Sequence, residues 1–143
     1  GYHKSDRAWK KHDFSETELA WIQDIAKKNT VILDAFAKPY SLSTIPNFED
    51  LIYKNQNARC FLAIEIENQN SKKHIMGSMI NAASLGRIGI GVAYNDNTLR
   101  TFIRIMNYLG FLRRVEKNTY DTTNFLIITK DQLAELLNLQ IQQ

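Results

Sequence analysis

The chain has 143 residues, of which 44% are hydrophobic and 23% charged, values typical of one soluble globular domain with a proper core. Its net charge of +3 permits a polyanionic partner without requiring one, and no apolar run approaches the roughly 20 residues of a membrane helix. Cys60 is the only cysteine, which excludes an intrachain disulfide and a cysteine-based zinc site and favours an intracellular, cytoplasmic location.

The first predicted element is a helix over residues 16–29. The sequence SETE at residues 15–18 is a capping box, with serine first and glutamate three residues later. Apolar residues follow at helical spacing and form the predicted buried stripe: Leu19, Ile22 and Ile25 or Ala26. Residues 30–38 fit either more helix or a short strand.

A β-hairpin is predicted next, with strands at residues 50–53 and 59–67 and a polar turn between them. Glu65 and Glu67 are two residues apart on the second, largely apolar strand, so they project from the same face. Across this hairpin Asp50 is opposite Glu65 or diagonal to it, with Cβ atoms about 5–8 Å apart. Three carboxylates are therefore expected to meet on one patch of the sheet.

The rest of the chain alternates helices and strands. The predicted elements are a helix at 72–85 capped by Ser71 and rich in small residues, a strand at 88–94, a helix at 98–110 stopped by Gly110, a strand at 125–129 and a helix at 131–139. The continuous apolar run IGIGVAY fits a central parallel strand that is buried on both faces. The fold class predicted from this order is α/β, with a mixed sheet of an antiparallel hairpin plus parallel strands, flanked by helices.

Converging carboxylates are the ligands that Mg²⁺ prefers, because this ion takes oxygen ligands, usually one or two carboxylates, and keeps positions for water and phosphate. A cation so held can activate a water and stabilise charge on a phosphoryl oxygen. Without a cation the cluster is unfavourable, since like charges repel. The alternative is a strand with one solvated face. Asp50 taken alone is equally well explained as a turn residue, and Glu49 replaces it if the register slips by one.

A family resemblance rests on these acids. Asp50, fourteen intervening residues and then Glu65-Ile66-Glu67 at the end of an apolar strand resemble the motif of the PD-(D/E)XK, or restriction-endonuclease-like, nucleases. The element order is similar to that family's core of helix, three strands, helix and strand. The chain departs from the motif in having no proline beside the aspartate and a glutamate, Glu67, at the usual lysine position, where some members also carry glutamate.

The resemblance implies a single nuclease-like domain over residues 1–143. Its restriction-endonuclease-like core is expected at about 15–94, with an α/β extension over 95–143 and a flexible segment at 1–14. The family's first helix carries an acid that helps to orient the metal site, and Glu18 is the candidate for it, besides its part in the capping box.

The activity implied by the resemblance is a Mg²⁺-dependent endonuclease, with Mn²⁺ as a substitute, that hydrolyses phosphodiester bonds in DNA. Asp50 and Glu65 would bind the metal. Glu67 would hold or orient the attacking water, and Lys73 would stabilise the developing charge in place of the missing lysine. Lys72 and Lys73 are also candidate phosphate contacts, with solvated surface lysines as the alternative.

A polar stripe of Arg100, Arg104 and Asn107 is predicted opposite the apolar side of the helix at 98–110. It is interpreted either as a solvated face or as a face that contacts DNA phosphates. Tyr108 is expected to pack against the protein rather than to stack on bases. His74 is expected to be a surface histidine or one satisfied by a partner, rather than a ligand or base.

Two other functional hypotheses stay open. The absent lysine favours a catalytically inactive module of the same fold that binds nucleic acid or assembles with protein. A structural α/β domain whose acidic strand faces solvent is the third. The predicted partners are DNA and a second copy in a homodimer, with no membrane.

Overall fold

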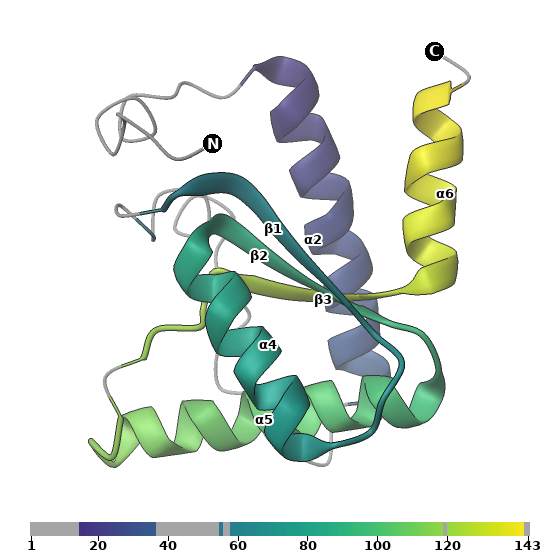
Figure 1. Cartoon of the computed structure of the whole chain (residues 1–143). Coiled ribbons are helices and arrows are strands. Elements are labelled where there is room, and N and C mark those ends of the chain that lie inside the picture. Colours follow the sequence, from purple (N-terminus) through teal and green to yellow (C-terminus); the bar gives the residue numbers. More distant parts are fainter. Residues whose placement is uncertain (1–14, 37–54, 56–57, 119, 142–143) are drawn as a thin grey trace.

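The computed structural model of the chain describes residues 15–36, 55, 58–118 and 120–141 (Figure 1). The described elements are α2 (Glu16–Phe36), β1 (Cys60–Glu67), α4 (Lys72–Leu85), β2 (Gly86–Ala93), α5 (Asp96–Arg114), β3 (Phe125–Thr129) and α6 (Lys130–Ile141). The segment 1–14 and the predicted strand at 50–53, which carries Asp50, lie outside the described residues.

The three described strands form one sheet in the order β1-β2-β3, and both pairs are parallel. In this register Glu65 pairs with Gly91 and Glu67 with Ala93. The predicted α/β class is confirmed, whereas the mixed sheet is a wrong prediction for the described strands. The reason is that α4 returns the chain between β1 and β2 and α5 returns it between β2 and β3, and such helical crossovers join parallel strands. The one antiparallel partner expected for β1 was the strand at 50–53.

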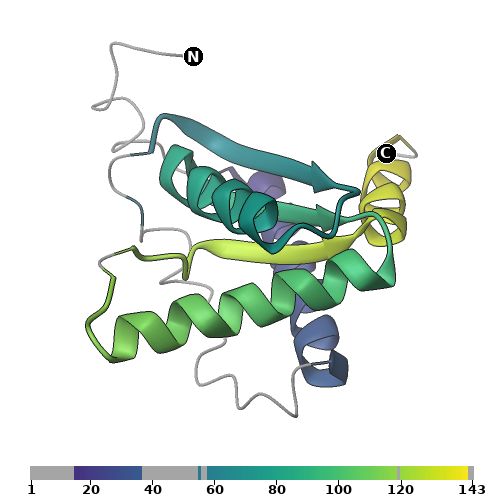
Figure 2. The same cartoon turned by 60° about the horizontal axis from the view of Figure 1, so that its bottom comes forward.

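Helices cover both faces of this sheet. Helices α4 and α5 pack on one face around Phe102 and Phe125, and helices α2 and α6 pack on the other around Ile88 and Ile90. Figure 2 shows α4 and α5 side by side in front of the sheet and α2 behind it. All eight residues of the central strand β2 are buried, as its continuous apolar run predicts. No described helix is long and apolar enough to cross a membrane.

Glycines in β2 allow close packing on the α4 and α5 face. A Cβ atom on Gly89 would lie 2.9 Å from the backbone of Ala82 and Ala83 in α4. A Cβ atom on Gly91 would lie 2.6 Å from the ring of Phe125 and 2.9 Å from that of Phe102. The small residues of α4 therefore let its backbone approach the sheet, and the rings fill the space above Gly91.

Local signals account for most helix boundaries. The capping box is formed, because Ser15 N donates to Glu18 Oε2 at 2.9 Å and Glu18 N donates to Ser15 Oγ at 3.2 Å. Helix α2 then continues to Phe36, so the ambiguous stretch is helical as far as that residue. The stop predicted at Gly110 is wrong, because α5 continues to Arg114. A glycine inside a helix costs only about 1 kcal/mol, which the burial of side chains such as Leu109 outweighs.

A buried asparagine ties the junction of α4 and β2 to β3. The Asn124 side chain donates to the backbone oxygens of Ala83 at 2.8 Å and of Gly86 and Arg87 at 3.2 Å. The side chain of Asn55 donates to the oxygen of Gly86 at 2.7 Å. The bonds to Ala83 and Gly86 satisfy carbonyl groups that the end of α4 leaves unpaired.

Candidate active site between β1 and α4

The acidic residues of β1 point toward α4. Glu65 and Glu67 both contact side chains of that helix, so the prediction that they share one face is confirmed. The apolar residues of the opposite face, Ile64 and Ile66, are 44% and 63% exposed. The outer part of β1 therefore has its carboxylates turned inward and these isoleucines turned outward. The alternative of a solvated acidic face is wrong for Glu67, which is only 5% exposed.

The Glu67 carboxylate is held by two side chains of α4. Its Oε1 accepts a hydrogen bond from Ser78 Oγ at 2.5 Å, and its Oε2 lies 3.3 Å from His74 Nε2. His74 and Ser78 are four residues apart and so lie on one face of the helix. A buried carboxylate is costly unless it accepts hydrogen bonds, and these two contacts supply partners for both oxygens.

Glu65 contacts the next turn of the helix, where Asn81 Nδ2 donates to its Oε1 at 3.3 Å. Asn81 is seven residues from His74, about 10 Å along the helix axis. The two carboxylates therefore bind different turns of α4 and do not share a partner. Among the described residues, no group of three or more His, Cys, Asp or Glu side chains is placed to hold a metal ion.

A pocket of about 500 Å³ opens beside these contacts. Its lining residues come from the end of β1 and one face of α4 with its N-cap: Glu65, Ser71, Lys73, His74, Gly77, Ser78 and Asn81. A Cβ atom on Gly77 would meet no described atom within 4 Å, so this glycine leaves the space open.

Charges of both signs meet in this pocket. Glu65 lies in its wall, and Lys73 and His74 come from the first turn of α4. The N-terminus of a helix carries a partial positive charge, which favours an anion nearby. A carboxylate together with a basic helix start suits a ligand that combines a cation with a phosphate group.

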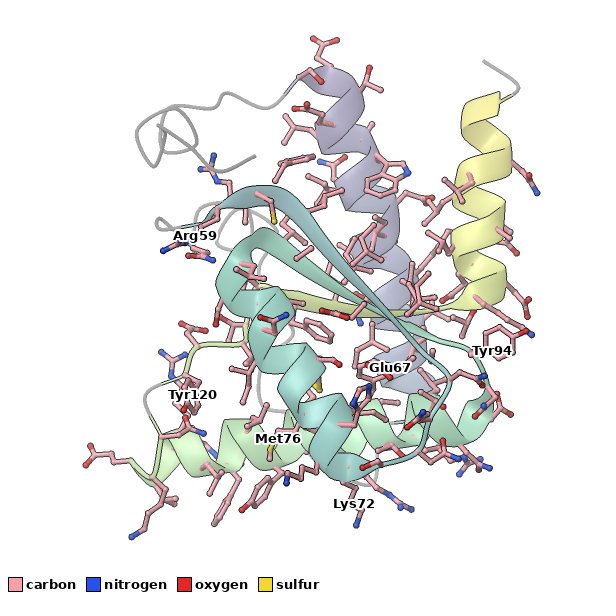
Figure 3. The ribbon with its side chains drawn as sticks, in the orientation of Figure 1. Arg59, Glu67, Lys72, Met76, Tyr94 and Tyr120 are labelled. Carbon is pink, nitrogen blue, oxygen red and sulfur yellow. The ribbon has the colours of Figure 1, made fainter. Side chains whose placement is uncertain are left out.

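The structure places the predicted lysines differently. Lys73 lines the pocket, whereas Lys72 is an exposed residue outside the lining. Figure 3 shows Lys72 projecting from the start of α4 away from Glu67. Only Lys73 therefore stands where it can meet a group bound in the pocket.

The other candidates are not brought to the pocket. Arg100 and Arg104 are exposed on α5 and do not line it. Glu18 belongs to the capping box of α2, and α2 packs on the opposite face of the sheet from α4. Asp50 lies outside the described residues, so its distance from Glu65 stays a prediction.

Three polar side chains of the site were not predicted from the sequence: His74, Ser78 and Asn81. The helical pattern contains a usable signal for them. Ile75, Met79 and Ala82 form the buried stripe of α4, and each of the three polar residues directly precedes one of these. Polar residues that border a buried stripe are placed to meet a polar group on the strand beneath.

Comparison of the chain with protein-family models, with curated proteins and with solved structures gives no match. The chemistry of this pocket has to be derived from its own residues.

Proposed function

We propose that the pocket between β1 and α4 hydrolyses phosphodiester bonds in DNA with the help of Mg²⁺ or Mn²⁺. The observation that supports this proposal is the inward orientation of Glu65 and Glu67 beside a pocket that Lys73 and His74 also border. The proposal includes a restriction-endonuclease-like core, in which β1, α4 and β2 correspond to the strand, helix and strand after the hairpin. It also includes a homodimer, whose two sites would cut the two strands of a duplex.

The residues that would hold the cation are Glu65 and Asp50. Oxygen ligands suit Mg²⁺, which is commonly bound through one or two carboxylates and completed by water and substrate phosphate. A pocket with one described carboxylate and open space fits that pattern. When bound, the cation would activate a water and neutralise charge on the phosphate.

Glu67 has a different part in this proposal. Because Ser78 and His74 engage both of its oxygens, we assign it the positioning of His74 in place of the role expected from the sequence, holding or orienting the attacking water. A proton on Nε2, shared with Glu67, makes Nδ1 the acceptor nitrogen of the neutral ring. His74 can then accept the proton of the attacking water while Lys73 stabilises charge on the phosphate.

The test is cleavage of plasmid DNA with Mg²⁺ or Mn²⁺ by the wild type and by Glu65→Gln. Glu16→Gln is the matched control, because Glu16 is an exposed glutamate on α2, away from the pocket. We expect wild type and control to cut and Glu65→Gln to leave the plasmid intact. Wild-type protein that leaves DNA uncut with both metals at low salt contradicts the proposal.

The second candidate is a catalytically inactive module that binds nucleic acid. The observation in its favour is that Glu67 occupies the motif's lysine position and is buried with both oxygens engaged. This candidate predicts DNA binding without cleavage, and binding that Glu65→Gln leaves unchanged or strengthens, because the substitution removes a negative charge near phosphate.

A further inference from the structure

The outer face of α5 carries a second feature, separate from the pocket. Five exposed residues at spacings of three or four follow one side of the helix, and we call them the outer stripe: Arg100, Arg104, Tyr108, Phe111 and Val115 just after the helix. At 3.6 residues per turn they fall within an arc of roughly 80°. The opposite side of α5 is buried against the protein.

Two aromatic rings stand in the middle of this stripe. Tyr108 is 52% exposed and Phe111 is 50% exposed, so the expectation that Tyr108 packs against the protein is wrong. The two residues are one helical turn apart, and Val115 follows at 44% exposure. Single exposed apolar residues are ordinary, whereas these three follow one another along one helix face and form a candidate contact surface.

The charge around the rings identifies the class of partner. Residues 96–117 contain five basic side chains and two acidic ones, Asp96 at the start and Glu116 at the end, and one of the five, Arg113, is paired with Asp121 at 2.7 Å. The outer stripe itself contains two arginines and no acid. Basic side chains that continue along the helix into aromatic rings complement a polyanion that has flat apolar groups.

We propose that the outer stripe of α5 binds single-stranded nucleic acid, with bases stacked on Tyr108 and Phe111 and phosphates contacted by Arg100 and Arg104. A single strand is required because its base faces are accessible, whereas those of a duplex are covered by neighbouring bases. Rings one turn apart can accept neighbouring bases of one strand. The binding needs neither a cation nor Glu65, so it goes beyond the activity proposed for the pocket.

The test is fluorescence anisotropy of a labelled 20-nucleotide oligothymidine and of a duplex of equal length, at low salt and in EDTA so that no metal-dependent cleavage interferes. The variants are Tyr108→Ala with Phe111→Ala, and Tyr108→Leu with Phe111→Leu, which keeps apolar bulk but removes the flat rings. Leu137→Ala is the control, because Leu137 is a 51% exposed apolar residue of α6, on the other face of the sheet. Circular dichroism and melting temperature confirm that each variant is folded.

We expect the wild type to bind the single strand more tightly than the duplex. Both double variants should lose about ten-fold or more in single-strand affinity, since base stacking is worth that much per ring, while Leu137→Ala binds as the wild type does. Equal affinity of wild type and double alanine variant overturns the proposal, as does preference for duplex or failure to bind. The protein could instead form a concentration-dependent dimer that the alanine substitutions abolish, and bind no oligonucleotide. That result overturns the proposal and identifies the outer stripe as a self-association surface. If the protein leaves plasmid DNA uncut but still binds the single strand, the proposal for the pocket has failed while the proposal for the outer stripe stands.

Discussion

His74 Nε2 and Glu67 Oε2 lie 3.3 Å apart, and of this pair the carboxylate is buried while the imidazole is more than half exposed. The contact joins the end of a strand to the first turn of the following helix. It gives an exposed ring one acidic partner beneath it. The proposed role of His74 in the pocket depends on this contact.

Replacing Glu67 with glutamine tests that dependence. Glutamine has the shape of glutamate but carries no charge, and it keeps only one acceptor oxygen for the two positions where Glu67 meets Ser78 Oγ and His74 Nε2. We expect Glu67→Gln to keep the fold, to weaken the preference for the Nε2–H tautomer, and to lower DNA cleavage by about ten-fold, the lower end of the range known for partners that orient histidines in metal sites. Long-range ¹H–¹⁵N NMR correlations of the His74 ring report the tautomer without any need for activity. An unchanged tautomer with reduced cleavage would show that Glu67 acts in some other way.

The cation can be tested through stability. An ion that binds only the folded state stabilises it by about 2.7 kcal/mol at 100 times its Kd, so millimolar Mg²⁺ should raise the melting temperature of the wild type. Glu65→Gln should abolish this response. It should also raise the melting temperature without metal, because it removes one of two neighbouring negative charges. Differential scanning calorimetry in EDTA and in Mg²⁺ measures both effects, and Glu16→Gln serves as the control. A response retained by Glu65→Gln would place the cation elsewhere.

Two glycines give a matched pair for packing. A Cβ on Gly91 would press on two phenylalanine rings, so Gly91→Ala should lower the free energy of unfolding by about 1–3 kcal/mol through overpacking. Gly77→Ala places the same methyl group in open space on a helix, where it should raise the free energy of unfolding by up to about 1 kcal/mol. Urea denaturation with a constant m value measures both. Effects of the same sign would contradict the contrast between these sites.

The Cys60 thiol provides a test that depends on pH. Burial raises the pKa of Cys60, and its Sγ donates to the backbone oxygen of Leu85 at 3.4 Å. A pKa that is higher in the folded than in the unfolded state favours the fold below the unfolded value of about 8.5, and this stabilisation is lost as pH rises through the folded value. We therefore expect native Cys60 to react with iodoacetamide more slowly at pH 8 than it does in guanidinium chloride. The urea midpoint should also fall more steeply above pH 8.5 for the wild type than for Cys60→Ser. Equal alkylation rates would contradict the burial of this thiol.

The elements that local signals define could be predicted from the sequence. The helix at 72–85 was predicted with its observed bounds, because Ser71 provides a cap and an apolar stripe follows. The strand at 125–129 was predicted with its observed bounds, since it is a short run of apolar and β-branched residues. The two-residue spacing of Glu65 and Glu67 correctly predicted a shared face, because the alternation of side chains is intrinsic to a strand.

What could not be predicted depends on contacts between distant segments. No local feature of Glu67 distinguishes a solvated carboxylate from one that a helix covers. The bonds to His74 and Ser78 exist only because α4 crosses back over β1. The end of α5 was predicted too early for a similar reason, since the apolar contacts on either side of Gly110 override the weak helix propensity of glycine.

The parallel sheet determines when the pocket can form during folding. Cys60 pairs with Gly86 and Gly89 pairs with Phe125, which are separations of 26 and 36 residues along the chain. Neither pairing can start from a tight hairpin, so β1 and β2 reach their register only when α4 has closed the loop between them. The same closure brings His74 and Ser78 over Glu67. Strand pairing and assembly of the pocket thus depend on the same closure of the chain, and an opening that moved β1 away from β2 and α4 would also take Glu65 and Glu67 out of the site.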